Sequence, residues 1–307
     1  MRIAHPANVA FHVLIAVLLG GTVAAVAWMS EAVPAAAWGG LVVFAAVLAF
    51  GLRRPLRRWR VAQQKLPASA RAWLDEHVPL YAHAAPKARA RFERDVRFVL
   101  AEATFEGVGG VEVTEDLQLA VAAGVAMLLH GRPDWELPLD RTFLFYPGEF
   151  GDDYSALEPA YDGMVHSQGP VILSAPAVRR SFRRPEDGSN VVLHELAHLF
   201  DYEDEFADGV PSLLDPGSVA PWAELVRRET AQIRRGRSML RQYAATNPAE
   251  FFAVATEVFF ERGTHLAERH PELFETMRAL YHLDPRPPED ARAEPEERES
   301  LMARRWR

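Results

Sequence analysis

Residues 190–201 read Asn-Val-Val-Leu-His-Glu-Leu-Ala-His-Leu-Phe-Asp, and this stretch does most to decide the fold. Outside its histidines and acids it is almost entirely apolar, so we expect a buried helix. His194 and His198 are four residues apart and project from one helix face, with Glu195 beside them. Burying two imidazoles and a carboxylate is costly unless they are paired, and a divalent cation is the natural partner. The pattern predicts a metal site in which Glu195 takes a proton from metal-activated water.

A catalytic metal needs a third protein ligand, and two segments offer one. Asp201 lies three residues after His198, but ligands on three successive turns of a straight helix would be strung along about 10 Å. We therefore expect Asp201 to support a ligand histidine or to fix the helix end. Residues 247–260 begin with Asn-Pro and then run strongly apolar, which predicts a second buried helix. Its carboxylates Glu250 and Glu257 are seven residues apart and share a face, and the residues alone favour neither as the ligand.

Three segments, residues 190–201, 207–211 and 242–260, resemble the Mlc titration factor A family of bacterial zinc peptidases. The resemblance extends more weakly from about residue 73 to residue 285. It implies an α+β, zincin-like metallopeptidase domain, mainly helical with a small sheet and similar to the catalytic domain of anthrax lethal factor. It also implies a single Zn²⁺ ion as the cofactor.

The same resemblance implies roles for individual residues. The family's metal ligands are the two motif histidines and the glutamate of a Pro-Ala-Glu triplet, which here are His194, His198 and Glu250. Glu257 is then left as a supporting carboxylate. Glu195 matches the general base of the family. The resemblance also implies that Tyr243, seven residues before the ligand glutamate, stabilises the transition state.

Two uncharged apolar runs, residues 11–29 and 35–52, stand near the start of the chain and are long enough to cross a bilayer. Five arginines follow within residues 53–60. We expect a transmembrane helical hairpin whose two outer ends, with all that follows, lie on the cytoplasmic side of the bacterial inner membrane. A cleaved signal peptide is the alternative. It is disfavoured because a second apolar run that ends in arginines does not normally follow a cleaved signal peptide. The soluble family member known best lacks this hairpin, so its regulatory role need not carry over.

Charge and composition divide the chain further. Residues 1–66 carry seven basic side chains and one acidic, whereas residues 67–307 carry 27 basic and 41 acidic. We expect a hairpin with a basic juxtamembrane segment (1–66), a peptidase domain (67–284) and a charged, disordered tail (285–307). An acidic body repels phosphate backbones, which argues against nucleic acid as a partner. The chain has no cysteine, which excludes thiol nucleophiles and cysteine-ligated metals.

Hydrophobic periodicity predicts a mainly helical body with few strands. Helices are expected at residues 68–76, 86–102, 115–130, 190–202, 221–232, 248–262 and 271–282, strands at 142–146 and 171–174, and a turn at 105–110. In many zincins the substrate adds as a strand to the sheet edge beside the active-site helix, and residues 171–174 are expected to form that edge.

The function expected from these features is hydrolysis of peptides or proteins at the cytoplasmic face of the membrane. One alternative is an HtpX-like or CAAX-type membrane protease, which would be expected to carry further transmembrane segments after the motif. Another is a membrane-tethered trap that binds and sequesters a transcriptional repressor, because the resembled family includes a repressor-binding member.

Overall fold

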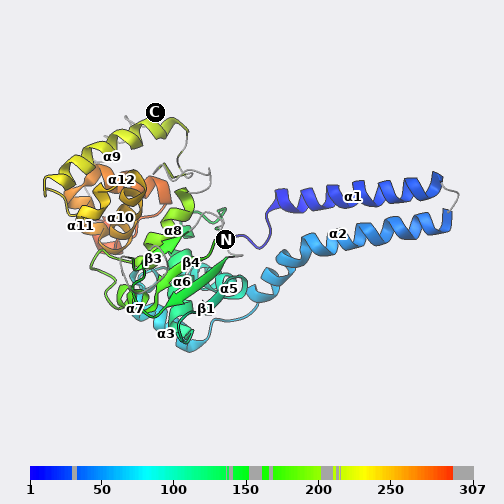
Figure 1. The fold of residues 1–307 in the computed structure, drawn as a ribbon, viewed down its shortest axis with the longest axis horizontal. Helices are drawn as coiled ribbons and strands as arrows, with labels where there is room; N and C mark the ends of the chain where they lie inside the picture. Colours follow the sequence, from blue (N-terminus) through cyan, green and yellow to red (C-terminus); the bar gives the residue numbers. More distant parts are fainter. Residues whose placement is uncertain are drawn as a thin grey trace. The chain divides into compact units, whose positions relative to one another are not determined.

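The computed structural model describes residues 1–29, 33–135, 137, 141–151, 161–165, 169–201, 210–211, 214 and 216–292. The chain forms two compact units, Met1–Lys65 and Leu66–Arg307 (Figure 1).

The smaller unit is a hairpin of two long helices, α1 (Pro6–Met29) and α2 (Val33–Ala62). The helices pack through glycines, since a Cβ atom at Gly20 would lie 2.8 Å from the carbonyl oxygen of Gly40. Both extend beyond the predicted apolar runs, and α2 continues through the arginine cluster because arginine is a good helix former. By length and composition, Pro6–Met29 and Trp38–Ala62 are each able to cross a membrane.

The larger unit is mainly helical and contains one small sheet, which confirms the predicted fold class. Its helices are α3 (Ala68–His77), α4 (Pro79–Ala82), α5 (Pro86–Glu102), α6 (Glu115–Leu129), α7 (Ala175–Arg183), α8 (Val191–Asp201), α9 (Val219–Arg234), α10 (Pro248–Glu261), α11 (Gly263–Arg269), α12 (Pro271–Tyr281) and α13 (Pro288–Arg292), with short 3₁₀ turns η1 (Pro216–Ser218) and η2 (Gln242–Ala245). Its strands are β1 (Thr104–Gly107), β2 (Thr142–Tyr146), β3 (Gly163–Val165) and β4 (Val171–Ser174).

The sheet has the strand order β1-β2-β4-β3. Strands β1, β2 and β4 are parallel, and β3 runs antiparallel to β4. The sequence predicts a turn at residues 105–110, but residues 105–107 belong to strand β1. Pairing with β2 keeps this part of the chain extended as far as Gly107. The predicted edge strand is also wrong: β4 pairs on both sides, and the edge is β3.

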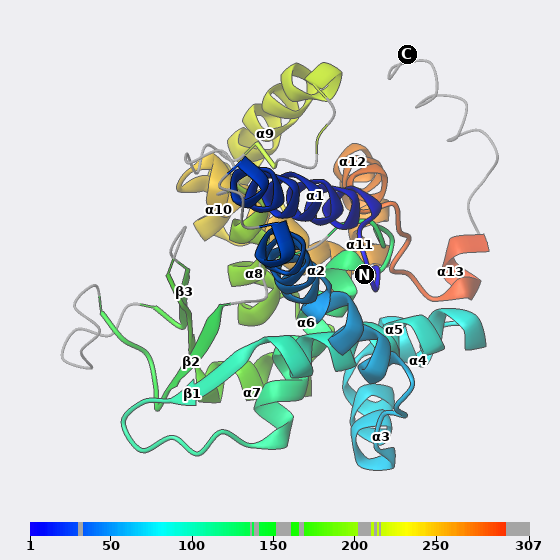
Figure 2. The same cartoon turned by 90° about the vertical axis from the view of Figure 1, so that its right-hand side faces the viewer.

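Helix α8 lies in the centre of the larger unit, between the sheet and α10 (Figure 2). Its apolar residues, including Val192 and Leu196, are almost fully buried. It also packs on α6, where a Cβ atom at Gly124 would lie 2.6 Å from Val192. The motif histidines are therefore carried by a helix that is buried within the unit.

The expectation of disorder from residue 285 differs from the structure over its first eight residues. The Arg286 side chain is buried, with its guanidinium 4.5 Å from the Phe274 ring centre and 2.6 Å from Asp284. Asp290 accepts a hydrogen bond from Thr264 at 2.6 Å. A charged and proline-rich composition suggested solvation, but these aromatic and ionic contacts fix the segment to the body. Residues 293–307 lie outside the described residues.

Candidate metal centre

Helix α8 begins at a side-chain cap. Asn190 Oδ1 accepts the backbone N–H groups of Val192 and Leu193, both at 3.1 Å, and its carbonyl oxygen accepts the N–H of His194. This cap fixes the first turn of the helix one turn before the first motif histidine.

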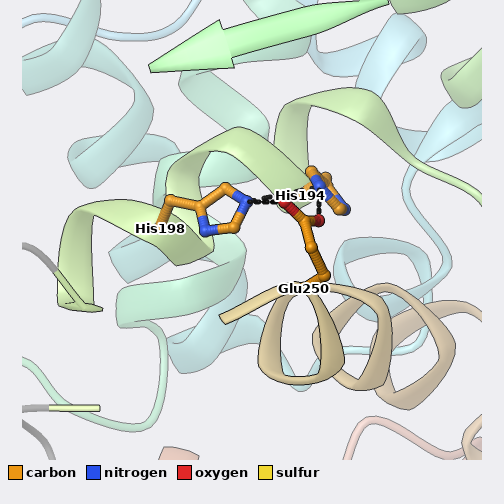
Figure 3. A group of neighbouring side chains, drawn as sticks. All are labelled: His194, His198 and Glu250. Carbon is orange, nitrogen blue, oxygen red and sulfur yellow. Dashed lines mark hydrogen bonds and ion pairs between the residues drawn. The ribbon is translucent and has the colours of Figure 1, made fainter. Parts of the chain in front are cut away.

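The two motif histidines face one another from successive turns of α8 (Figure 3). Both side chains are largely buried, and the Nε2 atoms of His194 and His198 are 3.3 Å apart. The spacing of four residues predicted this shared face, and the structure brings the two rings together.

Glu250 completes the group from α10. Asn247 caps that helix by accepting the Glu250 N–H at 2.9 Å, with Pro248 in the first turn as predicted. The Glu250 carboxylate lies 3.0 Å from His194 Nε2 and 3.7 Å from His198 Nε2. One ligand atom from each of His194, His198 and Glu250 lies within 4.8 Å of the others (Figure 3).

The donor set fits a divalent metal ion. His194 uses its Nδ1 to hydrogen-bond Glu257, so in the neutral ring the Nε2 lone pair faces the carboxylate of Glu250. Glu250 Oε2 is buried, and when the His194 ring is neutral this oxygen receives no hydrogen bond from the described residues. Lone pairs from two imidazoles and a carboxylate thus point into one small volume, which is the ligand chemistry of a first-row divalent ion.

The pKa shifts of His194 and Glu250 indicate that positive charge is stabilised within this cluster. Burial lowers the pKa of His194, but hydrogen bonding to Glu250 and Glu257 outweighs burial and raises that pKa to about 10. Burial would raise the pKa of Glu250, yet hydrogen bonds with His194 and His198 bring it well below its usual range. Without a metal, the site therefore holds a proton on His194 instead.

Glu257 supports His194 from the side away from Glu250. Its Oε1 accepts the His194 Nδ1–H at 2.7 Å, which sets the tautomer of the ligand ring. Glu257 is itself held by a bidentate pair with Arg241, at 2.6 Å and 2.9 Å, and by the N–H of Asn190 at 2.6 Å. Both oxygens of the buried carboxylate thus accept hydrogen bonds, and its role in supporting a metal ligand stays a prediction.

Glu261 lies one helical turn after Glu257 on the same face of α10, and it hydrogen-bonds the residues at the start of α8. It accepts the N–H groups of Gly188 and Ser189 at 2.9 Å and 3.0 Å, and the Asn190 side-chain amide at 3.0 Å. Burial raises the pKa of Glu261 to about 8. Helices α8 and α10 are therefore tied together by contacts that do not involve the ring nitrogens of His194 and His198 or the carboxylate of Glu250.

Glu195 lies against the edge strand of the sheet. Its carboxylate is buried, and burial raises its pKa while His194 and His198 oppose that effect. A Cβ atom at Gly163 of β3 would lie 2.5 Å from Glu195 Oε1, so only glycine leaves room for the carboxylate there.

Tyr243, from η2, stands at the open side of the group. Its ring centre is 6.0 Å from that of His194, and 42% of the residue is exposed. Burial of its hydroxyl and the nearby charge of Glu250 raise its pKa, so the phenol stays protonated. It can donate a hydrogen bond to a group bound beside the metal-ligating cluster.

Sequence reasoning missed Arg241 and Gly163. Two carboxylates on one face of a buried helix signal a need for cations, but the sequence does not say that Arg241 is one of them. Nothing in the local pattern marks Gly163. Asp201 is the last residue of α8, but its side chain lies outside the described residues.

Comparison with known proteins places this geometry in a family. The family described as glucose-regulated metallo-peptidase M90 matches residues 53–282. The chain belongs to the M90 family. The match includes all three residues of the metal-ligating group and begins only after most of the apolar hairpin.

Individual relatives agree with the M90 assignment. The chain is 30% identical over 244 residues to an uncharacterized protein of Synechocystis sp., covering 75% of this chain and 89% of that protein. It is 29% identical over 230 residues to Mlc titration factor A of Klebsiella pneumoniae, covering 68% and 84%. It is 26% identical over 250 residues to Mlc titration factor A of Serratia proteamaculans, covering 74% and 92%. The resemblance to the Mlc titration factor A family is thereby confirmed.

Proposed function

We propose that the protein is a zinc-dependent peptidase with His194, His198 and Glu250 as the zinc ligands. The observation that carries the proposal is the convergence of these three ligand atoms within 4.8 Å, with a buried glutamate next to the first histidine in the sequence. Two nitrogens and one carboxylate oxygen are a common protein ligand set of catalytic zinc, which keeps its remaining position open. Membership of a metallopeptidase family supports the same function.

A divalent ion in this site would acidify water and polarise the scissile carbonyl group. Glu195 would then act as the general base, accepting a proton from the attacking water and passing it to the leaving amine nitrogen. Its raised pKa suits both steps, because the carboxyl group can hold the proton between them. Tyr243 would donate a hydrogen bond to the carbonyl oxygen as that atom gains negative charge.

The substrate backbone would lie along β3, which is the sheet edge beside α8. A peptide added there as a further strand would be held by main-chain hydrogen bonds, which suit many sequences equally. Because Glu195 lies against Gly163 of that strand, the general base is next to the path of such a peptide.

We further propose that α1 and α2 anchor the enzyme in the bacterial inner membrane with the peptidase unit in the cytoplasm. Support comes from the length and apolarity of Pro6–Met29 and Trp38–Ala62. The arginines that follow the second apolar run favour a cytoplasmic position for that end. A helical hairpin with a short connection leaves both outer ends on one side of the bilayer.

A second candidate function is a membrane-tethered regulator. Several relatives are named Mlc titration factor A, a name that points to titration of the Mlc repressor by those proteins. This chain would then sequester a transcriptional repressor, and the metal site would serve mainly to hold α8 and α10 together. Substitution of Glu195 distinguishes the two, because a regulator would keep its partner when the general base is lost.

The test uses the full chain purified in detergent. We expect about one zinc per chain and turnover of a peptide library that a chelator abolishes and added zinc restores. Glu195→Gln should lower turnover by about a hundredfold or more while zinc content stays the same. Unchanged turnover in that variant with zinc bound would refute the role of Glu195, and a zinc-loaded wild type that cleaves no peptide would refute the peptidase.

A further inference from the structure

A cavity of about 210 Å³ opens beside the metal-ligating group, at the N-terminal end of α8. His194, Glu195 and Tyr243 line one side of it. Because the proposed general base and the proposed oxyanion donor both face this space, a substrate residue next to the scissile bond has direct access to it.

Small side chains line part of the cavity. Ala177 and Ser181 of α7 are buried there, and Val191 of α8 adjoins them. The Ser181 hydroxyl donates to the Ala177 carbonyl at 3.0 Å and accepts the Val191 N–H at 3.1 Å, so its polarity is already used within the protein. Ala177 and Val191 give this polar cavity a small aliphatic surface, against which the methylene stem of a long side chain can pack.

The arginines at the rim are already paired. Arg180 binds Asp162 at 2.7 Å, and Arg241 binds Glu257 through both of its terminal nitrogens. A carboxylate entering the cavity would have to compete with these ion pairs. The arginines therefore do not make the cavity an anion site.

Asp187 is the rim charge that lacks such a partner. Its carboxylate accepts the N–H of Ser189 at 2.9 Å, and no cation from the described residues pairs with it. The side chain is exposed and lines the cavity. Asp187 thus gives the cavity an exposed carboxylate that no cation of the described residues neutralises.

We propose that this cavity is a specificity subsite for a residue adjoining the scissile bond, and that it selects lysine or arginine through an ion pair with Asp187. The inference rests on the proposed peptidase function and adds the class of substrate to it. Since Asp187 is exposed, the pair is screened by water, and we expect a preference of about threefold to tenfold in kcat/KM over a neutral side chain.

The experiment uses the zinc-loaded full chain and peptides that differ at a single residue on either side of the cleaved bond. The variable residue is lysine, glutamine or glutamate. We expect kcat/KM to fall in that order at one of the two positions. Asp187→Asn should reduce the lysine-to-glutamine ratio to about one, and Asp187→Arg should favour glutamate.

Glu186→Gln is the matched control, because it removes the neighbouring exposed carboxylate, which does not line the cavity. It should leave the lysine-to-glutamine ratio unchanged. Peptides cleaved without regard to charge, or a ratio that Asp187→Asn leaves intact, would overturn the subsite while the peptidase stands. No turnover of any peptide by the zinc-loaded wild type would overturn the peptidase and, with it, the subsite.

Discussion

Glu257 accepts a hydrogen bond from His194 at 2.7 Å, on the ring nitrogen opposite the one that faces Glu250. Two carboxylates from one face of α10 thus contact the two ring nitrogens of His194, Glu257 at Nδ1 and Glu250 at Nε2. The seven-residue spacing of the glutamates makes this arrangement, since it places them two helical turns apart along the same side.

Removing this support should weaken the metal site. Glu257→Gln keeps the size of the side chain but loses the charge that fixes the histidine tautomer, so we expect zinc affinity to fall about tenfold to a hundredfold. Competition with a chromophoric chelator measures it. Glu250→Gln should lower the zinc affinity further than Glu257→Gln does, because it replaces a proposed zinc ligand. Equal affinities for wild type and Glu257→Gln would show that the hydrogen bond has no part in holding the metal.

Gly163→Ala should impair turnover without removing the metal. The added methyl group would lie 2.5 Å from Glu195 Oε1, so the carboxylate must shift away from the attacking water. We expect kcat/KM to fall about tenfold or more, since displacements of about 1 Å at a catalytic group cost that much. Gly148→Ala is the control, because a Cβ atom there meets nothing within 4 Å. A fully active, zinc-loaded Gly163→Ala variant would contradict the expected crowding.

Zinc binding should release a proton. In the metal-free protein the pKa of His194 is raised to about 10, so the ring is charged at neutral pH and zinc must displace that proton. Apparent zinc affinity should therefore rise about tenfold per pH unit between pH 6 and pH 8. Calorimetry in two buffers with different heats of ionisation would count the protons, and a value near zero would mean that His194 is already neutral.

His130 should make the protein sensitive to acid. Burial, with the nearby charge of Arg91, lowers its pKa to about 4, and its buried Nδ1 has no hydrogen-bond partner among the described residues. The folded state thus binds fewer protons than the unfolded state between pH 6.5 and pH 4, so stability falls as the pH drops through that range. We expect about 1–2 kcal/mol of loss at pH 5 from this group.

His130→Leu should remove that contribution. Thermal midpoints at pH 7 and pH 5 would show a smaller difference for the variant than for the wild type. An identical pH dependence in both proteins would show that another group controls the acid response.

The grouping of His194, His198 and a carboxylate from a second helix was partly predictable, because short sequence patterns indicate it. The spacing of His194 and His198 fixes their common face, and an apolar helix with carboxylates seven residues apart signals a second buried contributor. The residues alone left the choice between Glu250 and Glu257 open, because both lie on one face. Only the resemblance to a family favoured Glu250, which the structure places beside both rings.

The longer helices were also predictable from periodicity, whereas the short elements were not. β1, β3 and α7 are brief, and the two strands include glycine, so their pairing is set by distant partners. The sequence-based expectation of an edge strand at residues 171–174 fails because successive apolar residues, here 171–173, are typical of a strand covered on both sides. Arg241 acquires its role only when η2 brings it to Glu257, which no local pattern records.

The links from Glu257 and Glu261 to Asn190 and its neighbours join α8 to α10 without any ligand atom. These links would keep the two helices together when the proposed zinc is removed, so we expect the protein to stay folded without the ion. Co²⁺ would then be able to take the place of the proposed zinc, and its visible absorption would report the binding of ligands to the metal.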